Sequence, residues 1–273
     1  MVERTVTSFD GTPIWYSDSF TNGPTVVLLH GVSMASITNF DVHYGPDADG
    51  RMSPLPGPTI ASALRDVGAR AVAIDARGHG RPGRSSDPER YRGDSHAQDV
   101  TAVIDALGVD RFDLVGYSMG SVTAARMLNS EARLRAVALC GTGRWFLDDT
   151  NSQTLQAFHD CGQCFQTNAW NDHPEFKPFR AYARLDAVHD FDSIGAAMIG
   201  FDLVARDCVS STNIPVLVLN GGQDDGDGDA AALAEIIPGA AAVVAGDGNH
   251  GTAPSDPDFH SALVTFITQN WPK

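Results

Sequence analysis

Three side chains from distant parts of the sequence have the chemistry needed for nucleophilic catalysis: Ser118, Asp224 and His250. A serine hydroxyl is a weak nucleophile unless a base within hydrogen-bond distance removes its proton and a third group orients that base. A histidine suits the base role because its unperturbed pKa, about 6.5, lets it accept and return a proton at neutral pH. The sequence therefore predicts a serine nucleophile, if the fold brings these three residues together.

The surroundings of Ser118 are typical of an exposed nucleophile. It is the centre of Gly116-Tyr117-Ser118-Met119-Gly120, which follows the apolar run FDLV and precedes the helix-like stretch SVTAARML. A strand that turns sharply into a helix places the serine on a strained turn, with small neighbours that permit the tight backbone. The helix N-terminus then offers the backbone N–H of Met119 to a developing oxyanion.

Asp224 and His250 also follow apolar runs. Residues 216–219 (VLVL) lead into Asn220-Gly221-Gly222-Gln223-Asp224, and residues 241–244 (AAVV) lead into Ala245-Gly246-Asp247-Gly248-Asn249-His250. Because the carboxyl ends of parallel strands lie at one edge of a sheet, Ser118, Asp224 and His250 are expected to converge there. Other acids remain candidates for the orienting role, namely Asp148, Asp225, Asp227 and Asp229.

The pattern of strands and helices that must position these residues predicts an α/β fold. Short apolar runs predict strands buried on both faces of a parallel sheet, at residues 25–29, 71–74, 112–115, 136–139, 216–219 and 241–244. Helix-like stretches lie between them, at about 60–67, 95–107, 119–129, 229–237 and 256–269. The opening residues alternate around Asp10-Gly11, which predicts an antiparallel hairpin at the sheet edge. Together these patterns predict a doubly wound, mostly parallel sheet.

Two segments interrupt this alternation. Residues 33–57 form a long stretch rich in Gly, Pro and Asp, and such long loops are often functional. Residues 143–210 carry many aromatic residues and no clear buried strand. We predict that 143–210 is an inserted, mostly helical cap over the carboxyl edge of the sheet, whereas 1–142 and 211–273 form the core domain.

The sequence resembles the α/β-hydrolase superfamily over nearly its whole length. His30-Gly31 resembles the oxyanion loop of that family, and Asp75-Ala76-Arg77-Gly78-His79-Gly80 resembles its D-x-R-G-x-G turn. The order Ser, Asp, His along the chain is also the order in the family. We interpret His30 and His79 as residues that tie loops together rather than as catalytic bases.

The resemblance implies a role for each matching position. Ser118 is the implied nucleophile, His250 the general base and then acid, and Asp224 the orienting carboxylate, since it stands three residues after Gly221, where the family usually has its acid. The backbone N–H groups of Val32 and Met119 are the implied oxyanion hole. The serine nucleophile disfavours haloalkane dehalogenases and epoxide hydrolases, which use an aspartate, and Met119 stands where dehalogenases have a halide-binding tryptophan.

Composition narrows the classes of partner. The chain has 273 residues and a net charge of −15, which disfavours nucleic acid and anionic membrane surfaces. No apolar window reaches about 18 residues, and the first residues lack the apolar region of a signal peptide, so a cytoplasmic protein is expected. Four cysteines are too few for a disulfide framework, and Cys161 and Cys164 are interpreted as buried thiols rather than as half of a zinc or redox site.

The function predicted from these residues is hydrolysis of a small, uncharged or weakly charged carboxylic ester, or a similar acyl compound, through an acyl-enzyme on Ser118. No metal or organic cofactor is expected, and the small acyl substrate is the expected partner. The same three residues would also support a C–C bond hydrolase, a lactonase or a perhydrolase. A ligand-binding receptor without turnover is the alternative from another class, and the oligomeric state is left open.

Overall fold

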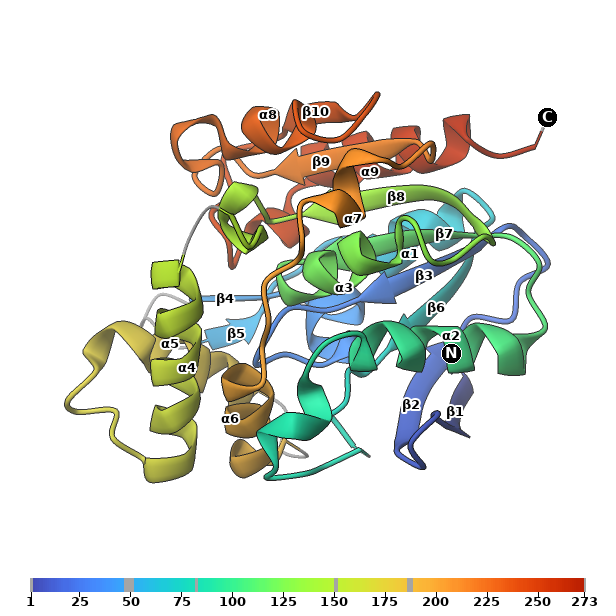
Figure 1. Ribbon diagram of the computed structural model, residues 1–273. Helices are drawn as coiled ribbons and strands as arrows, with labels where there is room; N and C mark the ends of the chain where they lie inside the picture. Colours follow the sequence, from blue (N-terminus) through green and yellow to red (C-terminus); the bar gives the residue numbers. More distant parts are fainter. Residues whose placement is uncertain (1, 47–51, 82, 150–151, 186–188, 273) are drawn as a thin grey trace.

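The computed structural model describes residues 2–46, 52–81, 83–149, 152–185 and 189–272. These residues form an eight-stranded sheet in the order β1-β2-β6-β3-β7-β8-β9-β10, and a separate pair, β4-β5 (Figure 1). The strands are β1 (Val2–Thr7), β2 (Pro13–Asp18), β3 (Thr25–Leu29), β4 (Tyr44–Pro46), β5 (Met52–Pro54), β6 (Arg70–Ile74), β7 (Phe112–Tyr117), β8 (Leu134–Cys140), β9 (Val216–Asn220) and β10 (Ala241–Val244). The helices are α1 (Ile60–Asp66), α2 (Ser95–Leu107), α3 (Met119–Met127), α4 (Ser152–Thr167), α5 (Lys177–Ala183), α6 (Phe191–Ile199), α7 (Asp207–Ser210), α8 (Asp229–Ala234) and α9 (Pro257–Gln269).

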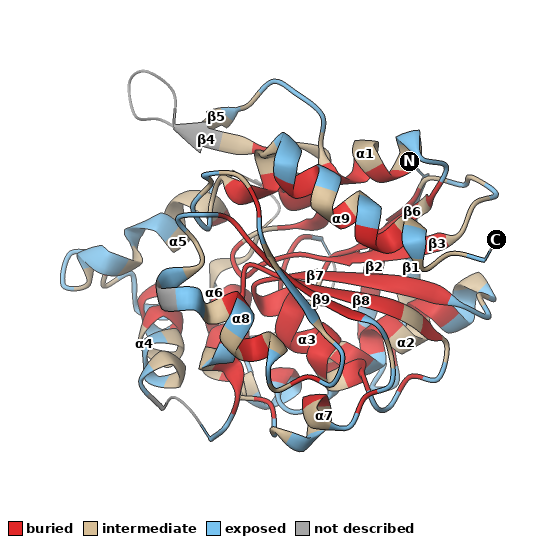
Figure 2. Cartoon of the chain, turned by 90° about the horizontal axis from the view of Figure 1, so that it is seen from above, coloured by how far each residue is buried: buried red, intermediate tan, exposed pale blue. Residues whose placement is uncertain are grey.

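The central strands are buried on both faces because helices cover each side of the sheet (Figure 2). Alternate residues of β3 belong to different cores: Val27 and Leu29 pack on the side of α2 and α3, whereas Val26 and Leu28 pack on the side of α1 and α9. From β6 to β10 every neighbouring pair of strands is parallel. β1 and β2 form the antiparallel hairpin at the edge. The predicted doubly wound α/β fold is confirmed.

The direction of winding reverses beside β3. The chain passes from β3 to β6 on one side and then returns past β3 to β7 on the other. The loops that leave the carboxyl ends of β3 and β7 therefore diverge onto opposite faces and leave a crevice between them, where open α/β sheets bind ligands. Val32 follows β3 and Ser118 follows β7, so this crevice lies between two of the predicted site positions.

Two expectations about individual segments need correction. The run 241–244 was expected to be buried on both faces, but β10 pairs only with β9 at the sheet edge, and Val244 is 50% exposed. An apolar run alone does not distinguish an edge strand from a central one. Residues 33–57 were expected to be a loop, yet they contain a one-turn π-helix, Ile37–Asp41, and the β4-β5 pair; residues 47–51 lie outside the described residues.

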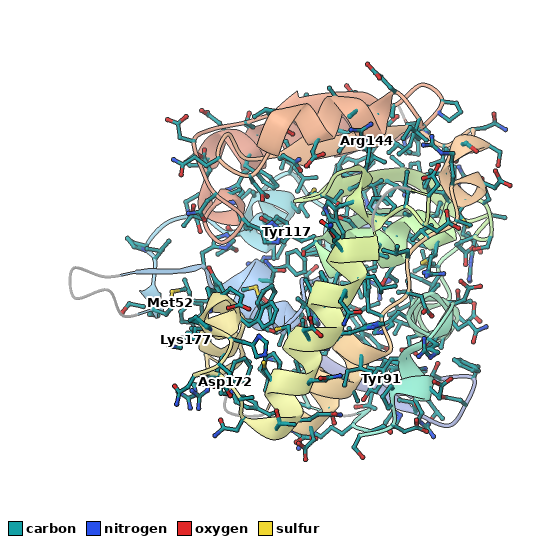
Figure 3. All side chains as sticks on the ribbon, turned by 60° about the vertical axis from the view of Figure 1, so that its left-hand side comes forward. Met52, Tyr91, Tyr117, Arg144, Asp172 and Lys177 are labelled. Carbon is teal, nitrogen blue, oxygen red and sulfur yellow. The ribbon has the colours of Figure 1, made fainter. Side chains whose placement is uncertain are left out.

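Residues 143–210, called the cap segment below, contain α4, α5, α6 and α7. α4 packs along α6, and both lie beside the carboxyl ends of the parallel strands (Figure 1). Phe165 and Trp170 pack edge to face within this segment, with ring centroids 4.8 Å apart. Figure 3 shows Tyr117 in the interior, whereas Asp172 and Lys177 lie on the outer side of the cap segment. The division of the chain into a core domain and the cap segment as a separate domain stays a prediction.

Candidate active site

Ser118 lies on a backbone turn that the neighbouring glycines make possible. Its φ of 52° and ψ of −114° fall outside the regions that non-glycine residues ordinarily adopt. A Cβ atom at Gly120 would collide with the backbone carbonyl of Leu29, and one at Gly116 would collide with the backbone of Gly120. The turn is braced from below by Ser121, whose Oγ lies 2.8 Å from the carbonyl oxygen of Gly116. Ser118 is therefore held by contacts that permit no side chain at two nearby positions.

Asp224 and His250 are carried by two loops that are joined through their backbones. The N–H of Gly222 donates to the carbonyl of Gly246, and the N–H of Gln223 donates to the carbonyl of Gly248, each at 3.1 Å. His250 Nδ1 lies 2.8 Å from Asp224 Oδ1. Because a carboxylate can only accept, Nδ1 carries the proton and Nε2 is left as an acceptor.

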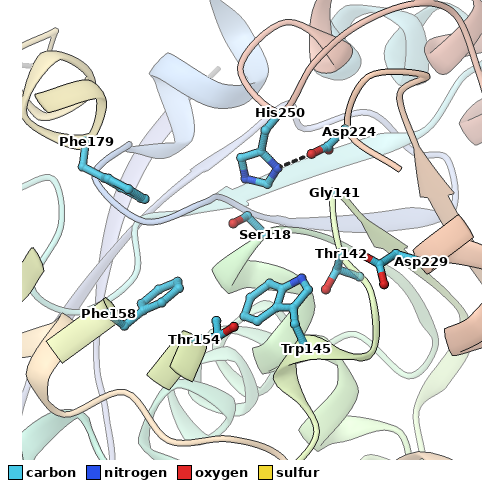
Figure 4. A pocket seen from close by; sticks show the side chains of 10 residues that line it. All are labelled: Ser118, Gly141, Thr142, Trp145, Thr154, Phe158, Phe179, Asp224, Asp229 and His250. Carbon is cyan, nitrogen blue, oxygen red and sulfur yellow. Dashed lines mark hydrogen bonds and ion pairs between the residues drawn. The ribbon is translucent and has the colours of Figure 1, made fainter. Parts of the chain in front are cut away.

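The structure brings Ser118 and His250 to the same cavities. Figure 4 shows the Ser118 hydroxyl facing the imidazole of His250, with Asp224 behind the ring. The Ser118 residue is 5% exposed, and the Asp224 side chain is 10% exposed. The His250 side chain is 52% exposed, so water can reach the ring from solvent. The three side chains thus lie at one site, where Ser118 and His250 line the same cavities and Asp224 is hydrogen-bonded to the imidazole.

Tyr117 is a residue of this site that sequence reasoning missed. Its hydroxyl donates to the backbone carbonyl of His250 at 2.6 Å, and the two rings lie with centroids 5.3 Å apart. Burial, and then the nearby Asp224 carboxylate, raises the pKa of Tyr117 well above 10, so the phenol keeps its proton and continues to donate. Its position beside Ser118 was visible in the sequence, but a contact over 133 positions leaves no local pattern.

The loop after β3 is fixed by His30. Its Nε2 accepts from the N–H of Ala76 at 3.0 Å, so Nδ1 carries the proton and donates to the carbonyl of Gly31 at 2.7 Å. Asn39 Oδ1 accepts from the N–H of Gly31 at 2.9 Å. His30 therefore ties the loop that carries Val32 to the turn after β6, which confirms its predicted loop-tying role.

His79 is buried within that turn. Its Nδ1 lies 3.3 Å from the carbonyl oxygen of Arg77, and burial lowers the pKa of His79 well below 6.5, so the ring is neutral. Arg77 in turn makes a bidentate pair with Asp99, at 2.6 and 2.7 Å. His79 belongs to the support of the site and does not line either cavity described below.

The predicted oxyanion positions lie in the two segments next to Ser118. Val32 lies in the loop fixed by His30, and a Cβ atom at Gly31 would come 3.4 Å from the Cβ of Ser118. Met119 follows Ser118 directly and begins α3, whose first N–H groups have no partner within the helix. Val32 and Met119 thus lie in the segments next to Ser118, and their role as oxyanion donors stays a prediction.

The other acids that the sequence offered for orienting His250 have different contacts. Asp225 Oδ1 accepts from Asn220 Nδ2 at 3.0 Å and from the N–H of Ala230 at 2.8 Å, so it organises the loop before α8. Asp148 is exposed, and its N–H donates to the carbonyl of Val204. Asp229 lines a cavity next to Ser118. The side chain of Asp227 is not among the side chains that the structure describes. Of the described acids, Asp224 is the one in contact with His250.

Two cavities meet at the nucleophile, and Ser118, Phe179 and His250 line both of them. The larger measures about 330 Å³ and the smaller about 250 Å³. The larger is lined further by Gly141, Thr142, Trp145, Thr154, Phe158, Asp224 and Asp229 (Figure 4). The smaller is lined further by Gly31, Val32, Met34, Tyr117, Pro178, Tyr182, Asn249 and Gly251. Ser118 is therefore accessible from both cavities.

Metal binding has no support in the part of the chain that the structure describes. Within it, no three His, Cys, Asp or Glu side chains lie close enough to hold a metal ion. Cys161 and Cys164 are free and buried on α4, and burial raises the pKa of the Cys161 thiol to about 12. No helix among the described residues has the length and apolar character needed to span a bilayer.

The sequence matches proteins of known family. The profile of a family described as "alpha/beta hydrolase fold" matches residues 24–165, just over half of the chain. A "2-hydroxy-6-oxononadienedioate/2-hydroxy-6-oxononatrienedioate hydrolase" from Burkholderia vietnamiensis is 30% identical over 137 residues, which is 49% of this chain and 42% of the relative. A protein of the same name from Paraburkholderia phymatum is 30% identical over 131 residues, 48% of this chain. The matched region spans less than half the length of these curated relatives.

Solved structures share the fold along the whole chain. A bromoperoxidase from Bacillus anthracis superposes with a TM-score of 0.74 at 21% identity, covering 98% of this chain and all of the other. An esterase from Rhodococcus superposes with a TM-score of 0.65 at 24% identity, covering 99% of this chain and all of the other. At these identities the likeness shows a common fold.

Proposed function

Because the chain belongs to the α/β-hydrolase family, we propose that it is a serine hydrolase that cleaves small carboxylic esters or similar acyl compounds. The observation that carries the proposal is the hydrogen bond between His250 Nδ1 and Asp224 Oδ1, at 2.8 Å. It orients the imidazole so that Nε2 can serve as the base for Ser118. No other described acid is in contact with His250 in this way.

The proposed reaction has two stages. In the first, Ser118 Oγ attacks the acyl carbon while its proton passes to His250 Nε2, and the N–H groups of Val32 and Met119 stabilise the oxyanion. The tetrahedral intermediate collapses, and His250 returns the proton to the leaving alcohol. In the second stage, water enters beside the half-exposed His250, loses a proton to Nε2, and releases the acid from Ser118.

The test uses a short p-nitrophenyl ester and a fluorophosphonate. We expect a burst of p-nitrophenol followed by steady turnover, and a gain in mass at Ser118 after phosphonate treatment. Ser118→Ala should lower kcat by about 10⁴-fold or more and abolish the mass gain. Ser130→Ala is the matched control, because Ser130 is exposed just beyond the far end of α3. Full activity in Ser118→Ala would refute the proposal.

A second candidate function is hydrolysis of a C–C bond in a ring-fission product. It is favoured by the curated relatives, whose names describe hydrolases of such compounds. Both candidates use Ser118, so the substrate must decide between them. Consumption of a 2-hydroxy-6-oxodienoate by the wild type with a higher kcat/KM than any short ester would favour this candidate, and the absence of such consumption would favour the esterase.

A further inference from the structure

One face of α5 forms a wall of the smaller cavity. Pro178, Phe179 and Tyr182 all line that cavity, and their spacing of three and four residues places them on the same side of the helix. Figure 4 shows the ring of Phe179 extending from α5 towards the site of Ser118 and His250. Of the three side chains from α5, that of Tyr182 carries a hydrogen-bonding group, the phenol. The cap segment therefore brings a polar group to the smaller cavity through Tyr182.

The phenol of Tyr182 lies against the loop that carries His250. A Cβ atom at Gly251 would collide with Tyr182 Oη, so the phenol oxygen occupies the space that a side chain at 251 would need. The backbone at Gly251 is itself fixed, because its N–H donates to Asn249 Oδ1 at 3.0 Å. Tyr182 and Gly251 both line the smaller cavity. The phenol oxygen is therefore held at a defined place in that cavity, beside the residue that follows the proposed base.

This phenol can donate a hydrogen bond to a ligand. Burial raises the pKa of Tyr182, so the hydroxyl keeps its proton at neutral pH. Among the residues that the structure describes, none accepts a hydrogen bond from it. Tyr117 also lines the cavity, but its hydroxyl already donates to the carbonyl of His250 at 2.6 Å. Because a polar group without a partner costs free energy when it is removed from water, a ligand that covers Tyr182 is favoured if it supplies an acceptor.

The rest of the lining favours an uncharged ligand. Val32, Met34 and Phe179 contribute apolar surface. None of the described residues that line the smaller cavity is Lys or Arg, and the protein carries a net charge of −15. A carboxylate would lose its hydration there without gaining a counter-charge, whereas an ether or carbonyl oxygen can accept from a phenol and carries no charge. The cavity is therefore suited to a mostly apolar chain that contains one such oxygen.

From these contacts we propose that Tyr182 is a specificity-determining residue, whose hydroxyl donates a hydrogen bond to an uncharged ether or carbonyl oxygen in the acyl chain of the substrate, with that chain in the smaller cavity. The inference rests on the proposed function, because it takes Ser118 as the residue to which the acyl chain is transferred. The larger cavity, whose wall includes the stacked rings of Trp145 and Phe158, is left for the leaving group. The preferred substrates are then esters of oxygen-substituted acids rather than of simple fatty acids.

The test compares esters whose acyl chains differ by one atom. The p-nitrophenyl esters of methoxyacetic, 3-methoxypropanoic and 4-methoxybutanoic acids place an ether oxygen at successive positions, and the butanoate, pentanoate and hexanoate are their alkyl isosteres. Binding to the Ser118→Ala protein is measured by calorimetry, so that no turnover is needed. For one of the three pairs, adding Tyr182→Phe should weaken the ether ester about fivefold more than its isostere, because the alkyl chain has no acceptor to lose.

A second variant tests the same contact from the other side. The Cβ atom of Gly251→Ala would displace the phenol oxygen, so this variant should remove the same preference for the ether, and it should add little to Tyr182→Phe. Tyr44→Phe is the matched control, because Tyr44 is also half-buried but lines neither cavity. We expect Tyr44→Phe to leave the ratio of affinities within each pair unchanged.

The outcomes separate this inference from the proposed reaction. The role of Tyr182 is overturned if Tyr182→Phe changes no pair more than Tyr44→Phe does, or if Gly251→Ala retains the full preference for the ether. Rapid hydrolysis of all six esters by the wild type would in that case leave the proposed reaction standing. A preference in binding that depends on Tyr182, together with no hydrolysis by the wild type, would instead count against the reaction alone. If none of the esters binds, both proposals fail.

Discussion

Ser118 and Phe179 line the same two cavities, yet contacts of different kinds hold them in place. Ser118 is fixed by backbone, because the chain at Gly116 and Gly120 approaches its neighbours too closely for any side chain. Phe179 belongs to α5 of the cap segment and is half-buried among other side chains. The edge of the sheet that carries Ser118, Asp224 and His250 is the proposed catalytic site and is called the catalytic edge below. Around Ser118 it therefore tolerates few changes of sequence, whereas the cavity wall can change its side chains and keep its fold.

The largest effect expected from this difference is at the acid of the catalytic edge. Asp224→Asn should lower kcat by about 10³ to 10⁴-fold, because an amide cannot stabilise the imidazolium and favours the wrong tautomer of His250. The measurement is steady-state hydrolysis of a short p-nitrophenyl ester. The variant should fold normally, since the shape of the side chain is retained.

Asp225→Asn gives the matched comparison one residue away. Asp225 accepts from Asn220 and from the N–H of Ala230, so the amide should disturb the start of α8 and not the imidazole. A loss of stability with kcat within a few-fold of the wild type is expected. If Asp225→Asn lowers kcat as far as Asp224→Asn does, the assignment of the orienting carboxylate is wrong.

The sequence marked the turns of the catalytic edge through local patterns. Ser118, Asp224 and His250 each follow an apolar run, and short-range glycine patterns mark the tight turns that carry them. A constraint imposed by local backbone geometry leaves a local signal. The α/β topology could also be predicted from the sequence. Apolar runs typical of buried strands alternate with helix-like stretches along the chain.

The remaining features depend on contacts between distant segments. The position of Asp229 opposite Gly143 results from the packing of α8 against the turn after β8, which no short pattern encodes. The exposure of β10 depends on its place in the strand order. The aromatic residues of the cap segment were visible in the sequence, but which of them face a cavity is decided by how α4 and α5 pack.

A second prediction concerns how His250 is held at the catalytic edge. Tyr117→Phe removes the hydroxyl that donates to the carbonyl of His250 at 2.6 Å, and should lower kcat by about tenfold with KM little changed. Because burial raises the pKa of Tyr117 well above 10, the phenol stays protonated. The tenfold deficit should therefore be the same at neutral and at mildly alkaline pH.

Tyr16→Phe serves as the control for this prediction. Tyr16 is a tyrosine of β2, 3% exposed, and it lines neither cavity, so its removal tests the loss of a buried hydroxyl alone. We expect kcat close to that of the wild type. Equal losses of kcat in Tyr16→Phe and Tyr117→Phe, matched by equal losses of stability, would mean that Tyr117 has a structural role and does not position His250.

The smallest effect is expected at the cavity wall. Phe179→Leu keeps an apolar side chain of similar reach but removes the ring that both cavities share, so KM for a short ester should rise by a few-fold while kcat changes by less. A series of esters that differ in acyl length is the measurement, because a wider wall should shift the preferred length. If Phe179→Leu lowers kcat as strongly as Tyr117→Phe, the cap segment takes part in positioning the reacting groups, and the distinction between a backbone-held catalytic edge and an exchangeable wall fails.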